Sequence, residues 1–518
     1  MFSRRRFLIN SSGGVFLSGR AERIAAGSAQ SSARISVDTA RGYTPFDRML
    51  FGQFLEHFHR QVYGGVFEPG SKLSDSQGFR LDVIEALREL RIPVVRWPGG
   101  CFASGYHWRD GVGPRREGAY DKAWRVEDPN TFGTDEFVAW CRKIGAEPFI
   151  CVNAGTGTAE EMSDWVEYCN LAKEGRFAKL RIENGSPKPH AVKYWSIGNE
   201  NYLPGELGAK TVAEWGVLVN EAAKMMRRVD PSIKLLTAAA PNADWILPLL
   251  RTAGRQLDYI SIHGYWDPLW QDNKPADYLT CMMRCGLPEK QIQMAEQTLA
   301  VAGLEDKIAI AFDEWNLRGW HHPHGNTAEA IQARDKNDIN ATYRMADAIF
   351  SAGFLNCCFR HARTVRMANM APVVNTRGPL FVHPRGIVKR TTFHVLKMYS
   401  DHSCPNVADA FVSADSLAHD GKSVPVLDAV VTCSSDWKTL CLAAINRHPE
   451  MEVSCSMRVD GAPLDGTFPA TFLSGDSPEA YNDVERPNRV IPVESNLKFR
   501  KGLASIPPHT LAVCRIVR

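Results

Sequence analysis

The feature that most limits the fold of this chain is a regular alternation of short apolar runs and amphipathic stretches between about residues 47 and 380. Eight of the runs have the composition of strands: Met49–Leu55, Pro93–Trp97, Pro148–Asn153, Lys193–Ile197, Lys234–Ala238, Tyr259–His263, Ile308–Phe312 and Phe354–Phe359. The stretches between them have helical spacing: Phe79–Leu90, Thr134–Ile144, Ala159–Ala172, Thr211–Val229 and Ala328–Phe350. Strands alternating with helices in this way predict an α/β fold, a (β/α)8 or TIM barrel, over residues 47–384.

The character of the chain changes after about residue 385. Short strand-like runs separated by turn residues follow, as in Leu427–Thr432, Thr439–Ile445, Ser454–Val459 and Thr510–Ile516. This pattern is typical of an antiparallel β-sandwich, which we predict for residues 385–518. Residues 34–46 precede the barrel, and their segment Arg34–Asp38 is expected to join the sandwich as a strand.

Residues 1–33 have the features of an export leader. The segment Ser3–Leu8, with three consecutive arginines, resembles the twin-arginine motif, and a weak apolar stretch and small residues around Ala25–Ala29 follow it. The sequence therefore predicts an exported protein, periplasmic or extracellular, with a disordered basic tail as the alternative. The 13 cysteines have no regular spacing, and their odd number leaves at least one unpaired, so we expect mostly buried free thiols.

Charge and hydropathy exclude two classes of partner. The net charge is +3 and 23% of residues are charged, without a basic stripe, so nothing indicates nucleic-acid binding. The apolar part of the leader is too short and too polar to span a bilayer, and no other segment has that character.

Two glutamates at the ends of apolar runs indicate the chemistry. Glu200 follows the fourth predicted strand and Glu314 follows the seventh. A carboxylate at the carboxyl end of a buried strand is costly unless it has a partner or a catalytic task. Two of them facing each other across a barrel are the groups that cleave a glycosidic bond, one as acid and one as nucleophile or base. The sequence alone does not give their separation, so retention and inversion both stay open here.

Longer motifs carry a resemblance to a known family. They are Phe51–His57, Tyr63–Gly70, Arg96–Phe102, Gly105–Pro114, Phe132–Phe137, Asn153–Thr158, Asp164–Asn170 and Asp313–Asn316. In this order the motifs resemble glycoside hydrolase family 51, the α-L-arabinofuranosidases, which are retaining barrel enzymes. The resemblance spans nearly the whole chain after the leader. It implies a carbohydrate substrate and hydrolysis of terminal α-L-arabinofuranosyl residues without a cofactor.

The resemblance also implies roles for the two glutamates. Glu200 matches the general acid/base, whose site should raise its pKa so that it starts protonated. Glu314 matches the nucleophile, which should be ionised. Arg96 matches the arginine near the nucleophile, and Tyr265 matches the tyrosine that donates a hydrogen bond to it.

Three further residues match the family's sugar-binding positions. Asn199 matches the asparagine that binds the sugar 2-hydroxyl, and Glu56 matches a glutamate that binds furanose hydroxyls. Cys101 stands where many members have a sugar-binding asparagine, and its thiol is a much weaker hydrogen-bonding group. Pro372 stands where many members have a glutamine, and Asn201–Gly205 differs from the family's usual tryptophan-bearing loop. These departures leave a galactofuranosidase, xylosidase or glucanase open.

Other readings of the chain stay open or are set aside. A non-catalytic carbohydrate-binding protein should have lost one carboxylate, and a lyase or isomerase should show a metal cluster or a phosphate-binding glycine motif. Trp266 and Trp315 either stack on sugar or pack, and Asp313 is expected on the opposite side of its strand from Glu314. His321–His324 is expected to be a loop without a metal. Family members often form trimers or hexamers, but the sequence identifies no interface, so monomer and homo-oligomer both stay open.

Overall fold

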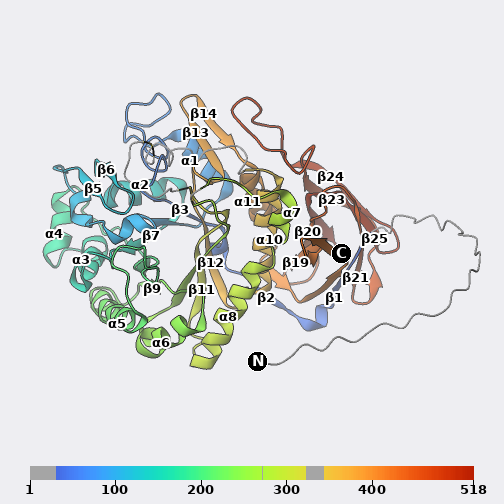
Figure 1. Ribbon diagram of the computed structural model, residues 1–518, viewed down its shortest axis with the longest axis horizontal. Helices are drawn as coiled ribbons and strands as arrows, with labels where there is room; N and C mark the ends of the chain where they lie inside the picture. The colour runs from blue at the N-terminus through green and yellow to red at the C-terminus, as the bar shows by residue number, and fades with distance from the viewer. Residues whose placement is uncertain (1–30, 271, 322–328, 330–342) are drawn as a thin grey trace, which may run out of the picture.

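The computed structural model of the protein describes residues 31–270, 272–321, 329 and 343–518 (Figure 1). The twin-arginine-like segment lies outside the described residues, as do 322–324 of the histidine-rich loop, and 328 and 330–342 of the helix predicted over Ala328–Phe350. Within the described ranges, no helix has both the length and the hydropathy needed to cross a membrane.

Eight parallel strands form the central sheet, in the order β10-β11-β12-β3-β4-β7-β8-β9. A parallel bridge between Ala238 and Ser261 joins the edges β9 and β10, so that the sheet curves into a barrel. Every residue of β4 and β8 is buried, because helices cover the outside of the barrel and side chains fill its interior. The strands are β3 (Gly52–Phe54), β4 (Val94–Trp97), β7 (Glu147–Val152), β8 (Tyr194–Ile197), β9 (Lys234–Thr237), β10 (Tyr259–Asp267), β11 (Ala309–Arg318) and β12 (Val365–Met370).

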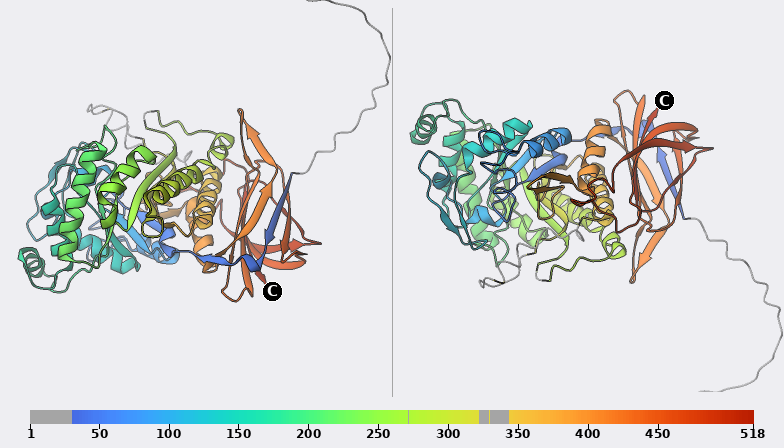
Figure 2. Two further views of the ribbon diagram at one scale, coloured as in Figure 1. Left: turned by 90° about the horizontal axis from the view of Figure 1, so that it is seen from below. Right: turned by 90° about the horizontal axis from the view of Figure 1, so that it is seen from above.

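Helices surround this sheet (Figures 1 and 2). Local sequence fixes their ends; for example, the Thr211 side chain accepts a hydrogen bond from the Glu214 backbone N–H, and Glu214 accepts one from that of Thr211, which starts α5. The helices between and after the barrel strands are α1 (Leu81–Leu90), α2 (Thr134–Ile144), α3 (Ala159–Asn170), α4 (Arg176–Glu183), α5 (Val212–Val229), α6 (Ala243–Ala253), α7 (Tyr278–Met282), α8 (Leu287–Ala302), α10 (Met345–Arg360) and α11 (Thr391–His402).

The prediction of the eighth strand was wrong. Phe354–Phe359 is part of helix α10, and the eighth strand is β12. A short apolar run does not distinguish a buried strand from a buried helix, and α10 is buried at every residue from Met345 to Phe359. The helix is apolar all round because it contacts β11 of the barrel on one side and β19 and β20 of the C-terminal domain on another.

The C-terminal domain contains two packed sheets (Figure 2). One has the order β16-β1-β21-β22, with β25 beside β21, and the other has the order β2-β15-β19-β20-β26-β23-β24. Strand β1 begins at Ser32, before the segment expected to join the sandwich, and pairs antiparallel with β16 and parallel with β21. The predicted fold class, a TIM barrel followed by a β-sandwich, is confirmed. The sandwich strands are β1 (Ser32–Val37), β2 (Tyr43–Pro45), β15 (Asn406–Ala408), β16 (Ala410–Ala414), β19 (Leu427–Cys433), β20 (Thr439–Asn446), β21 (Val453–Val459), β22 (Ala462–Pro463), β23 (Gly466–Leu473), β24 (Val493–Phe499), β25 (Leu503–Ile506) and β26 (Thr510–Val517).

Three hairpins complete the strands: β5–β6 (Ala119–Asp121 and Val126–Asp128), β13–β14 (Leu380–His383 and Gly386–Lys389) and β17–β18 (Ser416–His419 and Lys422–Pro425). All 13 cysteines are free, and only Cys101 and Cys404 are not fully buried. This agrees with the expectation of buried free thiols.

A cluster of charges at the end of α10 joins the two domains. Arg360 donates to Asp428 of β19 at 2.8 Å and lies 3.4 Å from Glu289 of α8. His361 lies 3.0 Å from Glu296 and 3.5 Å from Glu289. Burial disfavours the charged imidazole, but the two glutamates outweigh burial and raise the pKa of His361 to about 9.

This cluster makes stability depend on pH. An unfolded histidine titrates near pH 6.5, so the folded chain holds the His361 proton more tightly. The resulting stabilisation is complete below about pH 6.5 and is lost as pH rises through about 9. We expect His361→Gln to be less stable than the wild type by about 1 kcal/mol at pH 6 and nearly equal to it at pH 10, in urea unfolding. An unchanged gap at the two pH values would contradict the assignment.

Candidate active site

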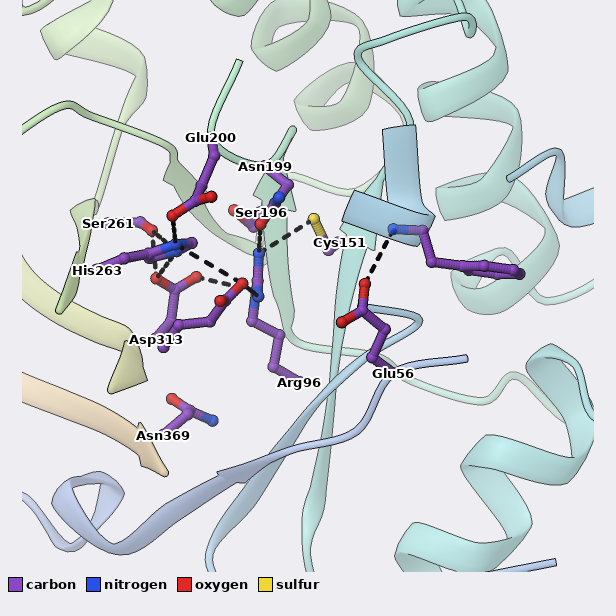
Figure 3. Close-up of polar contacts among 12 residues, drawn as sticks. Glu56, Arg96, Cys151, Ser196, Asn199, Glu200, Ser261, His263, Asp313 and Asn369 are labelled. Carbon is purple, nitrogen blue, oxygen red and sulfur yellow. Dashed lines mark hydrogen bonds and ion pairs between the residues drawn. The ribbon is translucent and has the colours of Figure 1, made fainter. Parts of the chain in front are cut away.

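The seven residues singled out from the sequence lie toward the carboxyl ends of the barrel strands, and Figure 3 shows four of them, Glu56, Arg96, Asn199 and Glu200. Arg96 lies in β4, Tyr265 in β10 and Glu314 in β11, whereas the other four follow β3, β4 or β8 directly. In a (β/α)8 barrel this end of the sheet is where active sites are built. The residues that follow a strand are Glu56, Cys101, Asn199 and Glu200.

Glu314 is held by a cation and a hydroxyl. Arg96 donates to its Oε1 at 2.6 Å, and the Tyr265 hydroxyl donates to its Oε2 at 2.8 Å. The Arg96 side chain is fully buried and that of Glu314 is 6% exposed, so water screens this pair very little. The other end of the guanidinium donates to Asn199 Oδ1 at 2.9 Å.

Glu200 lies opposite, and His263 bridges the two carboxylates. The Glu200 backbone has a left-handed φ of 35°, which turns the chain sharply after β8. His263 Nδ1 is 2.9 Å from Glu200 Oε1 and 3.7 Å from Glu314 Oε1. One carboxylate oxygen of Glu200 and one of Glu314 lie within 4.8 Å of each other.

The expectation that this site raises the pKa of Glu200 was wrong. Burial does act in that direction, but the hydrogen bond and charge of His263, with the charge of Arg96, outweigh it and lower the pKa of Glu200. His263 provides this charge because Glu314, Asp313 and Glu200 together overcome its burial and raise its pKa to about 10. The Glu200–His263 pair therefore titrates as a unit.

The expected orientation of Asp313 was also wrong. Ser261 and His263 of β10 pair with Ala311 and Glu314 of β11. Two residues of β11, Phe312 and Asp313, therefore lie opposite the single residue Ile262 of β10. The extra residue is a β-bulge, which breaks the alternation of side chains. Asp313 consequently faces the same way as Glu314: its carboxylate lies 3.1 Å from Arg96 Nε and 3.2 Å from His263 Nε2 (Figure 3).

Glu56 is fully buried beside this cluster. Its Oε1 accepts hydrogen bonds from the Phe102 backbone at 2.9 Å and the Trp124 indole at 3.0 Å. Its Oε2 is buried and has no hydrogen-bond partner among the described residues. A Cβ atom at Gly99 would lie 2.6 Å from the Glu56 side chain. Glycine at this position therefore leaves room for the carboxylate and also allows the positive φ of the turn. Burial and the charge of Glu314 raise the pKa of Glu56.

Trp266 and Trp315, considered from the sequence, and the motif residue His57 make packing or structural contacts. Trp315 stacks on Phe354 at 3.9 Å, and Trp266 lies 5.3 Å from Phe350, so both pack against α10. His57 Nδ1 contacts Asp128 at 2.6 Å, and Trp97 donates to its other ring nitrogen.

Comparison with known proteins decides the family. Residues 86–282 match the family model "Alpha-L-arabinofuranosidase 1 domain" and residues 313–509 match "Alpha-L-arabinofuranosidase C-terminal domain". The chain is 35% identical to an intracellular exo-α-(1→5)-L-arabinofuranosidase of Halalkalibacterium halodurans, over 82% of this chain and 87% of that protein. It is 33% identical to a probable α-L-arabinofuranosidase C of Aspergillus fumigatus, over 94% of this chain and 98% of that protein.

Comparison with solved structures supports the same family. The arabinose complex of an α-L-arabinofuranosidase from Thermotoga maritima matches with a TM-score of 0.84 and 31% identity, over 94% of this chain and all of the other. A family 51 α-L-arabinofuranosidase from Thermotoga petrophila matches over the same shares, with a TM-score of 0.82 and 32% identity. The chain belongs to glycoside hydrolase family 51.

Two residues of this family 51 site were not singled out from the sequence. His263 is two positions before Tyr265 on β10, and this spacing on one strand face is a signal that could have identified it. Glu206 lies directly after Asn201–Gly205, the segment that differs from the family's usual loop. It accepts a hydrogen bond from the Ser104 hydroxyl at 2.6 Å. No spacing rule identifies Glu206, because a folded-back loop brings it to the site.

We expect Asp313→Asn to destabilise this family 51 protein by about 3 kcal/mol, since it leaves two buried cations short of one counter-charge. Chemical denaturation of the variant and the wild type measures the change. Asp306→Asn, in an exposed turn before β11, is the matched control and should stay within about 0.5 kcal/mol of the wild type. Equal stability of Asp313→Asn and wild type would contradict this account of the charge cluster.

Proposed function

We propose that this family 51 protein is a retaining, exo-acting α-L-arabinofuranosidase with Glu314 as nucleophile and Glu200 as acid/base. One observation carries the proposal: a carboxylate oxygen of Glu200 and one of Glu314 lie within 4.8 Å. Retaining glycosidases need their carboxyl groups about 5–5.5 Å apart, whereas inverting enzymes need about 6.5–9.5 Å to admit a water between acid and base.

In the first step, Glu314 attacks the anomeric carbon and the bond to the leaving oxygen breaks. Arg96 and Tyr265 hold one Glu314 oxygen each, which fixes the carboxylate for attack. The leaving oxygen takes up a proton from the Glu200–His263 pair, which titrates as a unit across its 2.9 Å contact. Glu200 is the member of the pair that faces the leaving group in this proposal.

In the second step, Glu200 removes a proton from water, and the water oxygen replaces Glu314 at the anomeric carbon. The sugar leaves with its original configuration. Asn199 and Glu56 are proposed to bind the sugar hydroxyls, and the buried, unpartnered Oε2 of Glu56 supports this role. A hydrogen bond from a sugar hydroxyl to this oxygen would be strong, because the oxygen is shielded from water.

The proposed substrate is a terminal arabinofuranosyl residue on a plant-polysaccharide side chain or oligosaccharide. The names of the relatives support this, since one is an exo-α-(1→5)-L-arabinofuranosidase. Cys101 and Pro372 motivate the second candidate, a glycosidase of the same mechanism with another sugar specificity. Hydrolysis of a panel of para-nitrophenyl glycosides separates the two: activity on the α-L-arabinofuranoside supports the first, and activity only on another glycoside supports the second.

We also propose export through a twin-arginine pathway. The support is the sequence Ser3–Leu8 and the apolar stretch after it. Because a twin-arginine substrate folds before export, reduced cysteines can be buried first, which agrees with the free thiols throughout both domains.

Glu314→Ala should lower kcat on para-nitrophenyl α-L-arabinofuranoside by about 10⁴-fold or more, because no other group can form the covalent intermediate. Steady-state kinetics measures the loss, and an unchanged thermal unfolding curve shows that the variant is folded. A variant that retained a tenth of the wild-type rate would refute the nucleophile assignment.

Glu200→Ala should lose about 10²–10⁴-fold on substrates with poor leaving groups and much less on activated aryl glycosides, which need little protonation. Azide should restore turnover by attacking the glycosyl-enzyme in place of activated water. The product would then be the glycosyl azide, identified by mass spectrometry. If azide changes neither the rate nor the product, Glu200 is not the acid/base.

A further inference from the structure

Glu206 lies beside the sugar pocket in a position that the proposed mechanism does not use. The loop after Glu200 folds back on itself, with backbone hydrogen bonds from Leu203 to Glu200 and from Glu206 to Leu203. This brings the Glu206 carboxylate to η3 (Cys101–Ser104), the short helix that begins with the cysteine at the family's asparagine position. The side chain is largely buried, with the residue 8% exposed.

Glu206 contacts three polar side chains there. Ser104 donates to its Oε1 at 2.6 Å, and Asn199 Nδ2 lies 3.5 Å from the same oxygen. The Cys101 thiol lies close enough to the Glu206 carboxylate for the two groups to interact electrostatically. Within the part of the chain that the structure describes, its hydrogen-bond donors, Ser104 and Asn199, are neutral, and a buried carboxylate without a cation is costly.

Asn199 connects Glu206 to the catalytic charges. Its Oδ1 accepts from Arg96 at 2.9 Å, and its Nδ2 points to Glu206. An amide can be placed either way round, and only the hydrogen bonds at its two ends fix which atom is which. With Arg96 at the oxygen and Glu206 at the nitrogen, the Asn199 amide has one orientation.

The properties of Cys101 also suggest a role for Glu206. It is partly exposed and lies close to Glu56, Glu200 and Glu206, whose charges all act on its thiol. A thiol is a weak donor and a weak acceptor, so Cys101 by itself offers a sugar hydroxyl little. A carboxylate directly behind it offers strong acceptors.

We propose that Glu206 is a specificity-determining residue: it orients the Asn199 amide and supplies, behind Cys101, the hydrogen-bonding capacity that a cysteine lacks. The proposal rests on the proposed function and deepens it.

The test is a double-mutant cycle between Glu206→Gln and Cys101→Asn, with kcat and KM measured on para-nitrophenyl α-L-arabinofuranoside. In the wild-type background, we expect Glu206→Gln to lower kcat/KM about tenfold. In the Cys101→Asn background, where an amide faces the sugar, the same change should cost about threefold or less. An equal cost in both backgrounds, or no cost in either, overturns the proposal.

Ser104→Ala is the matched control for a merely structural role. It removes the shortest hydrogen bond of Glu206 but leaves Asn199 and Cys101 in place. We expect this variant to keep kcat/KM within about threefold of the wild type. If Ser104→Ala reproduces the full loss of Glu206→Gln, Glu206 only anchors the loop and the proposal fails.

Alkylation of Cys101 provides a readout that does not need activity. Burial first, and then the charges of Glu206, Glu56 and Glu200, raise the pKa of its thiol, so Glu206→Gln should speed its reaction with iodoacetamide. L-Arabinose should slow it. Peptide mass spectrometry separates Cys101 from Cys404, the other partly exposed cysteine. An unchanged Cys101 rate in Glu206→Gln contradicts the contact.

The two proposals fail in different ways. A wild-type protein inactive on the arabinofuranoside, with the Cys101 rate still dependent on Glu206 and slowed by another sugar, contradicts only the proposed substrate. An active wild type whose Glu206 variants match it in kinetics and alkylation contradicts only the role of Glu206.

Discussion

The site depends on one fully buried cation. Arg96 lies in the barrel interior with Asp313 at one nitrogen, Glu314 at the second and Asn199 at the third. A guanidinium suits this position because its planar set of donors remains charged at any relevant pH. It holds Glu314, the proposed nucleophile, balances the charge of Asp313 beside it, and donates to the Asn199 amide, which is proposed to bind the sugar. The β-bulge in β11 is required for this arrangement, since it turns two consecutive carboxylates toward one arginine.

His263 is the second organiser, and it couples the two halves of the reaction. It contacts Glu200, Asp313 and Glu314, so its charge depends on all three. In the proposed mechanism Glu314 becomes an ester, and one of these negative charges disappears. The imidazolium then loses an electrostatic partner and holds its proton less firmly, while Glu200 must change from acid to base. The proton balance of the acid/base is therefore tied to the covalent state of the nucleophile.

Much of the fold was predictable because the signals were long and periodic. Helices such as α2 and strands such as β20 match their predicted ranges within a residue or two, since amphipathic spacing and turn residues define them locally. The residues brought together at the site were predictable from the family motifs. The misplaced strand at Phe354–Phe359 was not, because an apolar run inside a protein is compatible with either element.

The remaining differences arise from tertiary structure. The side of β11 on which Asp313 lies depends on a bulge that only pairing with β10 and β12 reveals. The pKa of Glu200 depends on an imidazole from another strand, and Glu206 reaches the pocket through a loop whose sequence departs from the family pattern. Such effects join residues far apart in the chain, where no periodicity exists to be detected.

Helix α10 has a consequence for what counts as the catalytic unit. The helix is covered by the barrel on one side and by the sandwich on the other, and α11, which contacts both α10 and α1, is encoded after the point where the barrel pattern ends. The sandwich therefore supplies part of the apolar interior that a free-standing barrel would need. A chain cut between the two domains would expose the apolar surface of α10 to water. The barrel on its own should therefore be prone to aggregation, and the two domains depend on each other for solubility.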